Sequence, residues 1–201
     1  MISKQRSVGI LGGTFDPIHI GHLSLALEML DAHKLDEVWF CPAARNPLKK
    51  QGASASDEDR LAMIRLAIKD IPQLKCKNVE LTRPAPSYTI DTLNIFQHEM
   101  LKKKRNTKFY LILGEDSAET FFDWKQPQDI LKLVTVIVGR REIISKVKHN
   151  IPHELNNGIT LTRYIEISGT DIRKRIRKGQ HVEHLLPTPV WKYIKRKKIY
   201  N

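Results

Sequence analysis

Short apolar runs alternate with amphipathic stretches from one end of this 201-residue chain to the other. The apolar runs are rich in Val, Ile, Leu and Phe, and several of them contain almost no polar residue. Such runs are typical of strands that are covered on both faces of a sheet. They predict strands at residues 7–11, 38–41, 77–81, 109–113, 134–138 and 160–167.

The amphipathic stretches place apolar residues at the spacing of one helix face, as at Leu23, Ala26, Leu27 and Leu30. They predict helices at residues 22–33, 57–70, 89–103, 127–133, 169–178 and 189–197. This alternation predicts an α/β fold, a Rossmann-like doubly wound parallel sheet with a small C-terminal helical portion, in a single domain over residues 1–201. Such sheets bind ligands beyond the carboxyl ends of their strands, near the point where the strand order reverses.

The composition is that of a globular protein, with 41% hydrophobic and 28% charged residues. No apolar run approaches the roughly 18–20 residues of a membrane span. The basic N-terminus lacks the apolar stretch of a signal peptide, so we expect a cytoplasmic protein without a membrane partner. The two cysteines, Cys41 and Cys76, match neither a disulfide framework nor a zinc-binding spacing.

The formal net charge of +12 raises the question of a polyanionic partner. Much of the excess lies in basic runs at residues 102–105, 173–178 and 192–198. The simplest interpretation is a set of solvated helix faces, followed by attraction of phosphate-bearing small molecules and then by polynucleotide binding. Charge alone does not decide between these interpretations.

The strongest candidate for chemistry follows the first predicted strand, where the chain reads GGTFDPIHIGHL. The glycines Gly12 and Gly13 let the backbone approach a ligand closely, because no side chain intervenes. The helix that follows presents unpaired amides and a positive dipole end, which suit a phosphate. His19 and His22 stand three residues apart and should point to the same side of the first helical turn. Two imidazoles there could hydrogen-bond phosphoryl oxygens as negative charge builds up during transfer.

Other interpretations of this segment are open. A Gly-Gly turn is common in loops, and a histidine at a helix start is often a solvated cap. Two histidines at this spacing could also bind zinc, but no third ligand stands at a suggestive spacing. The segment is neither a Walker loop nor a Gly-x-Gly-x-x-Gly dinucleotide fingerprint.

A second candidate element, ISGTDIR, covers residues 167–173. It follows a predicted strand and opens a predicted helix, so its amides would form a second anion site. Thr170 could donate its hydroxyl to a phosphate, and Arg173 could neutralise a β- or γ-phosphate. Ser168 with Asp171 also fits a helix capping box, and both roles can hold together.

As one string, GGTFDPIHIGHL resembles the (T/H)xGH nucleotidyltransferase superfamily, whose His-x-Gly-His element is shared with class I aminoacyl-tRNA synthetases. The second element fits as well, although the family usually reads Ser-Ser/Ala-Thr-x-x-Arg and Gly169 fills the variable second place here. The resemblance implies that His19, His22 and Arg173 are catalytic. The ATP-binding residues that it implies are Gly12, Gly13, Thr14, Phe15, His19, Gly21, His22, Ser168, Thr170 and Arg173.

Further strings resemble bacterial nicotinate-nucleotide adenylyltransferases: ELTRPAPSYTIDTL at 80–93, LGEDSAETFFDW at 113–124, VGRR at 138–141 and LLPTPVWKYI at 185–194. In that family Trp124 would stack on the pyridine ring of the acceptor nucleotide, because a flat aromatic suits a flat ring. The alternatives are a core tryptophan for Trp124, and a helix cap or a solvated carboxylate for Asp116. The acceptor-binding residues implied are Lys49, Tyr88, Thr89, Asp116, Trp124 and Arg141.

One departure from the family lies after the second predicted strand. Ala43 and Ala44 stand where the family often has asparagines, so amide contacts made there in relatives are not carried over. Lys49 still matches the basic position that follows.

The resemblance implies direct in-line transfer of AMP from ATP to nicotinate mononucleotide. Mg²⁺ is expected as the ATP salt, and no metal-ligating residues are expected because the chain shows no dedicated carboxylate cluster. The nearest alternatives are phosphopantetheine adenylyltransferases and glycerol-phosphate-type cytidylyltransferases. Membership of those families would not account for the strings at 80–93 and 113–124. A synthetase-related RNA-binding protein would explain the charge, yet 201 residues leave little room for an RNA-binding region. We therefore expect no nucleic-acid partner, and the oligomeric state is open.

Overall fold

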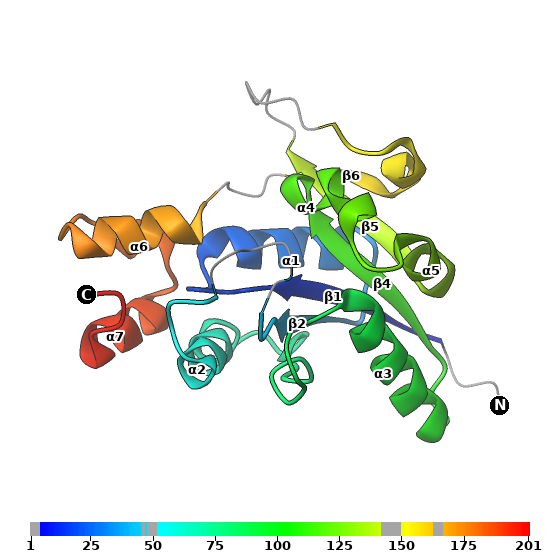
Figure 1. Cartoon of the computed structure of the whole chain (residues 1–201), viewed down its shortest axis with the longest axis horizontal. Helices are drawn as coiled ribbons and strands as arrows, with labels where there is room; N and C mark the ends of the chain where they lie inside the picture. Colours follow the sequence, from blue (N-terminus) through cyan, green and yellow to red (C-terminus); the bar gives the residue numbers. More distant parts are fainter. Residues whose placement is uncertain (1–4, 46, 48–51, 142–149, 163–166) are drawn as a thin grey trace.

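The computed structural model describes residues 5–45, 47, 52–141, 150–162 and 167–201. At its centre lies a sheet of six parallel strands (Figure 1). The order across the sheet is β3-β2-β1-β4-β5-β6. The strands are β1 (Arg6–Gly13), β2 (Glu37–Pro42), β3 (Leu74–Cys76), β4 (Thr107–Gly114), β5 (Thr135–Arg141) and β6 (Ile159–Thr162). This order is that of a Rossmann-like doubly wound sheet, so the predicted fold class is confirmed.

Helices cover both faces of the sheet (Figure 1). The α-helices are α1 (Ile20–Ala32), α2 (Asp57–Ala67), α3 (Thr89–Lys102), α4 (Glu115–Glu119), α5 (Pro127–Leu133), α6 (Gly169–Arg177) and α7 (Thr188–Lys197). Short 3₁₀ helices are η1 (Phe121–Asp123), η2 (His153–Gly158) and η3 (Glu183–Leu185). No helix within these described ranges is long and apolar enough to cross a membrane.

Alternate side chains of a strand pack into two separate hydrophobic cores, one on each face of the sheet. In β4, Phe109, Leu111 and Leu113 belong to the core beneath α3 and α5. Ile112, between them, belongs to the core beneath α1 and α2. Because successive residues of a strand point to opposite faces, a strand with a core on each side must be apolar throughout. This explains the continuous apolar runs in the sequence.

Most predicted strands are confirmed. The predictions at 7–11, 38–41, 109–113 and 134–138 correspond to β1, β2, β4 and β5, and 160–167 overlaps β6, with residues 163–166 outside the described ranges. The prediction at 77–81 was wrong, because β3 covers Leu74–Cys76 and 77–81 consists of turns and irregular backbone. Leu74 is buried and pairs with Val38, whereas the buried carboxylate of Glu80 accepts a 2.8 Å hydrogen bond from Thr92 of α3. The segment after β3 therefore turns toward α3 instead of extending the ladder.

The six predicted helices are also found, and α5 has its predicted bounds. The additional α4, η1, η2 and η3 were not predicted, because elements of three to six residues are too short to show a helical period.

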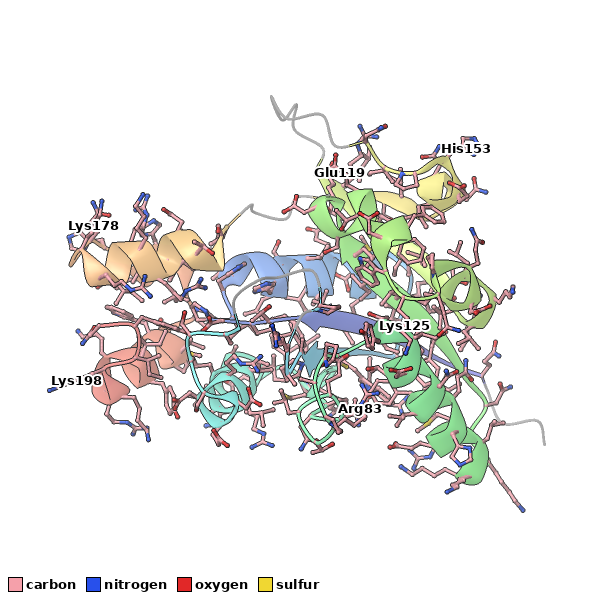
Figure 2. The ribbon with its side chains drawn as sticks, viewed as in Figure 1. Arg83, Glu119, Lys125, His153, Lys178 and Lys198 are labelled. Carbon is pink, nitrogen blue, oxygen red and sulfur yellow. The ribbon has the colours of Figure 1, made fainter. Side chains whose placement is uncertain are left out.

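The small C-terminal helical portion is confirmed by α6 and α7. Both lie beyond the carboxyl end of β1, at the left of Figure 1. They are anchored to the rest of the fold by Ile172, Val190 and Ile194, which are buried in the same core as residues of α1 and α2. Lys178 and Lys198 lie at the outer side of these helices, away from the sheet (Figure 2).

The strand order reverses between β1 and β4. In the register of these two strands, Leu11 lies opposite Ile112, so β1 ends at Gly13 beside the end of β4 at Gly114. The switch point of an open α/β sheet is where its ligand binds. The GGTFDPIHIGHL string and the LGEDSAETFFDW string both begin at this place.

Candidate active site

The two histidines of the first motif lie together at the start of α1. His19 is the N-cap residue and His22 lies in the first turn. Their rings stack with centroids 3.6 Å apart and planes 18° apart, so the prediction that they share one side of the helix is confirmed. The backbone N–H of His19 donates to His22 Nδ1 at 3.3 Å. In the neutral imidazole of His22 the proton therefore sits on Nε2, which makes that atom a donor.

His19 is not a solvated cap, because it is only 5% exposed. Burial lowers the pKa of His19 from 6.5 to about 4, so its imidazole is neutral near pH 7. Its Nδ1 atom and the hydroxyl oxygen of Thr14 are both buried without a hydrogen-bond partner among the described residues. Buried polar atoms are nearly always paired, so two orphans in one short segment indicate a ligand.

The glycines of the motif end β1, and Phe15 follows them with its ring buried 4.9 Å from that of His22. Gly12 is exposed, and a Cβ atom added there would meet nothing within 4 Å. The packing of the chain therefore does not require glycine at this position. Because glycine has no side chain, it leaves the backbone here open to close approach by a ligand. Gly21 is buried in the first turn of α1.

Asp16 joins the first motif to its surroundings. Its buried carboxylate accepts from the amides of Ser54 at 2.7 Å and Ala55 at 3.0 Å, and from the hydroxyl of Tyr200 at 2.7 Å. Arg173 Nη1 lies 3.4 Å from Asp16 Oδ2, the oxygen that also accepts from Ser54, and it donates to the backbone carbonyl of Asp16 at 2.6 Å. Burying a polar side chain is costly unless it is hydrogen-bonded, and these contacts supply Asp16 with its partners.

The second motif meets the first through this contact. A Cβ atom at Gly169 would lie 3.0 Å from the Asp16 carbonyl oxygen, so the variable place of the family motif carries glycine here because the two backbones approach closely. Arg173 Nη2 donates to Thr170 Oγ1 at 3.2 Å. The structure thus brings Thr170 and Arg173 to the segment that carries His19 and His22.

Ser168 is the N-cap residue of α6 by position, but its side chain makes no cap hydrogen bond among the described residues. Asp171 instead accepts from Arg175 at 2.9 Å. The capping-box alternative is therefore not realised, and the Ser168 hydroxyl is exposed at the helix start.

Arg60 is a member of this network that the sequence motifs did not reveal. Its side chain is fully buried, and Nη1 donates to the carbonyl of Thr14 at 2.7 Å while Nη2 contacts Asp57 at 2.5 Å. A signal was present, since Arg60 stands three and four residues before Met63 and Ile64, on the buried face of α2. Arg60 supports the backbone at the end of β1.

The string ELTRPAPSYTIDTL, which runs into α3, is hydrogen-bonded to the segment after β2. Ser87 Oγ accepts from the amide of Ala44 at 3.0 Å, and the Ser87 amide donates to the carbonyl of Arg45 at 2.9 Å. Tyr88 is the N-cap residue and Thr89 the first residue of α3. The Ser87 hydroxyl therefore binds the segment after β2, and the N-cap position of α3 belongs to Tyr88.

Lys125 connects this helix start to the second acceptor string. Its Nζ atom lies 4.4 Å from the ring centroid of Tyr88 and 3.6 Å from a carboxylate oxygen of Asp91. Figure 2 shows Lys125 beside the first turn of α3. The residue before it is Trp124, so Tyr88 and Trp124 are brought to one region, and both pack on the same core.

Trp124 is half-buried and its ring lies 5.5 Å from that of Phe121. Its Nε1 atom is buried without a hydrogen-bond partner within the described part of the chain. Core tryptophans usually find a partner for this group, so the orphan N–H favours a ligand-facing role. Asp116 is exposed in the first turn of α4, directly after β4, while Gly114 is the N-cap residue there.

Two predicted site residues are not placed by their side chains. Lys49 lies outside the described residues. Arg141 ends β5 with its backbone, and its side chain lies outside the described part. Among the residues that the structure does describe, no group of three His, Cys, Asp or Glu side chains could hold a metal ion.

Comparison with known proteins connects this geometry to a family. Residues 10–175 match the cytidylyltransferase-like family. A probable nicotinate-nucleotide adenylyltransferase of Synechococcus sp. is 35% identical, with 98% of this chain and 96% of the relative aligned. One of Dehalococcoides mccartyi is 38% identical over 96% of both chains.

Among solved structures, the fold is similar to that of nicotinic acid mononucleotide adenylyltransferase of Plasmodium falciparum, complexed with NaAD. The TM-score is 0.78 at 18% identity, over 98% of each chain. The chain therefore belongs to the nicotinate-nucleotide adenylyltransferases, nucleotidyltransferase enzymes of the cytidylyltransferase-like family.

Proposed function

We propose that this protein transfers AMP from ATP to nicotinate mononucleotide and releases deamido-NAD and pyrophosphate, a step of NAD biosynthesis. One observation carries the proposal on the ATP side. Thr14 Oγ1 and His19 Nδ1 are buried without partners, within the described residues, at the switch point of the sheet. Nucleotide phosphates would supply the missing hydrogen bonds.

The reaction needs no covalent intermediate. A phosphate oxygen of nicotinate mononucleotide attacks the α-phosphorus of ATP, and the bond from that phosphorus to the bridging oxygen breaks as pyrophosphate leaves. Catalysis then consists of holding the two nucleotides in line and stabilising the charge that develops on the phosphoryl oxygens.

The residues divide into three groups in this proposal. His22, through Nε2, and His19 serve the α- and β-phosphates. Arg173 and Thr170 serve the β- and γ-phosphates from the start of α6, where Ser168 adds a hydroxyl. Gly12, Gly13, Thr14, Phe15 and Gly21 form the surface against which ATP lies.

The acceptor nucleotide would lie beside the starts of α3 and α4. Trp124 stacks on the pyridine ring, and its orphan N–H becomes available to the ligand. Asp116 binds a ribose hydroxyl, and Tyr88 and Thr89 bind the pyridine substituent. Lys49 and Arg141 are proposed to add positive charge for the acceptor phosphate.

Mg²⁺ is proposed to enter with ATP and to be held mainly by its phosphates. Bound there, the ion would neutralise phosphate charge.

The test compares acceptors in a coupled pyrophosphate assay with saturating ATP and Mg²⁺. Nicotinate mononucleotide should support turnover, and phosphopantetheine should not. Faster turnover with phosphopantetheine would reject the acceptor while leaving the nucleotidyltransferase chemistry intact.

A further inference from the structure

The end of the chain turns back toward the switch point after α7. Lys198 and Tyr200 have positive φ angles of 54° and 72°, and the amide of Ile199 donates to the carbonyl of Ile194 at 3.1 Å. This reversal carries the ring of Tyr200 into the core that α6 and α7 share with α1 and α2. Tyr200 is only 7% exposed, one residue before the last of the sequence.

The Tyr200 hydroxyl reaches Asp16, 184 positions earlier in the chain, and donates to Oδ1 at 2.7 Å. The amide of Ala55 donates to the same oxygen at 3.0 Å. Burial and the neighbouring Asp16 carboxylate raise the pKa of Tyr200, so the hydroxyl remains a protonated donor at every physiological pH.

Asp16 in turn fixes the second phosphate motif. Its carbonyl and carboxylate both face Arg173 Nη1, and Arg173 Nη2 then faces Thr170. The guanidinium is planar, so holding one nitrogen sets the direction of the others. Tyr200 therefore contacts Asp16, and Asp16 contacts Arg173, one of the residues assigned above to the ATP phosphates.

We propose that Tyr200 is a positioning residue of the ATP site, which holds Asp16 so that Asp16 orients Arg173 toward the phosphates. The proposal rests on the ATP site assigned above. It makes the last turn of the chain a part of the nucleotide site, although Tyr200 itself touches no substrate.

The test replaces Tyr200 by Phe, which removes the hydroxyl and keeps the ring. Tyr193→Phe is the matched control, because the Tyr193 hydroxyl donates at 2.8 Å to Asp59 on α2, outside the phosphate motifs. Isothermal titration with ATP alone should show an affinity about tenfold weaker for Tyr200→Phe, the scale of one hydrogen bond to a charged group. Tyr193→Phe should bind ATP as the wild type does. At saturating ATP, the KM for nicotinate mononucleotide should be unchanged in both variants.

A double variant distinguishes a positioning role of Tyr200 from a general loss of stability. Arg173→Lys removes the planar guanidinium, so adding Tyr200→Phe to it should weaken ATP binding further by less than about twofold. Equal ATP affinity for Tyr200→Phe and the wild type would overturn the proposal, as would an equal fall for Tyr193→Phe, a rise in the acceptor KM, or loss of cooperative melting. Titration with ATP does not depend on the acceptor, so it decides the role of Tyr200 even if nicotinate mononucleotide gives no turnover.

Discussion

The imidazole rings of His19 and His22 stack 3.6 Å apart at the N-terminus of α1, with the His19 amide donating to His22 Nδ1. The pair is therefore one unit, in which the backbone of the first histidine sets the tautomer of the second. Since burial keeps the pKa of His19 low, its imidazole is neutral near pH 7 and offers hydrogen bonds rather than a fixed positive charge.

Replacing His22 by Ala should lower kcat on the order of a hundredfold, because the lost donor acts mainly on the charge of the transition state. ATP affinity measured by titration should change much less. His33→Ala is the control, since His33 caps the other end of α1 and contacts Thr160. A fall in kcat of only about twofold for His22→Ala, with unchanged melting, would reject the catalytic role.

His19 should make the free enzyme sensitive to acid. Its pKa is about 4 in the folded chain and 6.5 in the unfolded chain, so below pH 6.5 protons bind preferentially to the unfolded state. The corresponding stability is complete above pH 6.5 and is lost as the pH falls toward 4. Between pH 7.5 and 4.5 the wild type should lose about 2–3 kcal/mol more than His19→Gln, as measured by denaturant unfolding. The same loss in both proteins would contradict the burial of an uncharged imidazole.

Trp124→Ala should raise the KM for nicotinate mononucleotide about tenfold and the KM for ATP little, because stacking on the acceptor ring is lost. Phe122→Ala is the comparison, since Phe122 is also half-buried on the same core two residues earlier. That variant should lower the melting temperature without changing either KM selectively. If Trp124→Ala raises the KM of both substrates equally and also lowers the melting temperature, Trp124 is a core residue.

The start of α3 should favour a pyridine carboxylate over a carboxamide. The first amides of a helix have no partner within it and lie at a positive dipole end, and Thr89 adds a hydroxyl. A carboxylate accepts charge-assisted hydrogen bonds there, whereas the carboxamide points an N–H₂ group at donors. We expect kcat/KM for nicotinate mononucleotide to exceed that for nicotinamide mononucleotide roughly tenfold to a hundredfold. Equal values for the two nucleotides, measured side by side, would reject acid selectivity.

The sheet and the first phosphate motif were predictable because their signals are local. A strand, a glycine pair and two histidines at one helical turn follow each other without interruption from Ser7 to His22. The strand β3 was misplaced because three residues carry no usable period, and because the buried Glu80 beside it binds to Thr92 instead of extending the sheet.

The support of the site was not predictable, because it depends on contacts between distant parts of the chain. Asp16 lies within the motif, but its partners Ser54, Ala55, Arg173 and Tyr200 come from three other segments. No spacing in the sequence relates these positions. Only the folded chain shows that Asp16 joins the two candidate phosphate-binding motifs.

The most direct test of the central claim is to identify the products from ATP, nicotinate mononucleotide and Mg²⁺ by chromatography and mass spectrometry. Attack at the α-phosphorus predicts deamido-NAD and pyrophosphate in equal amounts, and their formation should fall with His22→Ala. Formation of ADP together with inorganic phosphate or a phosphorylated acceptor would place the attack at the γ-phosphorus and contradict the assigned reaction.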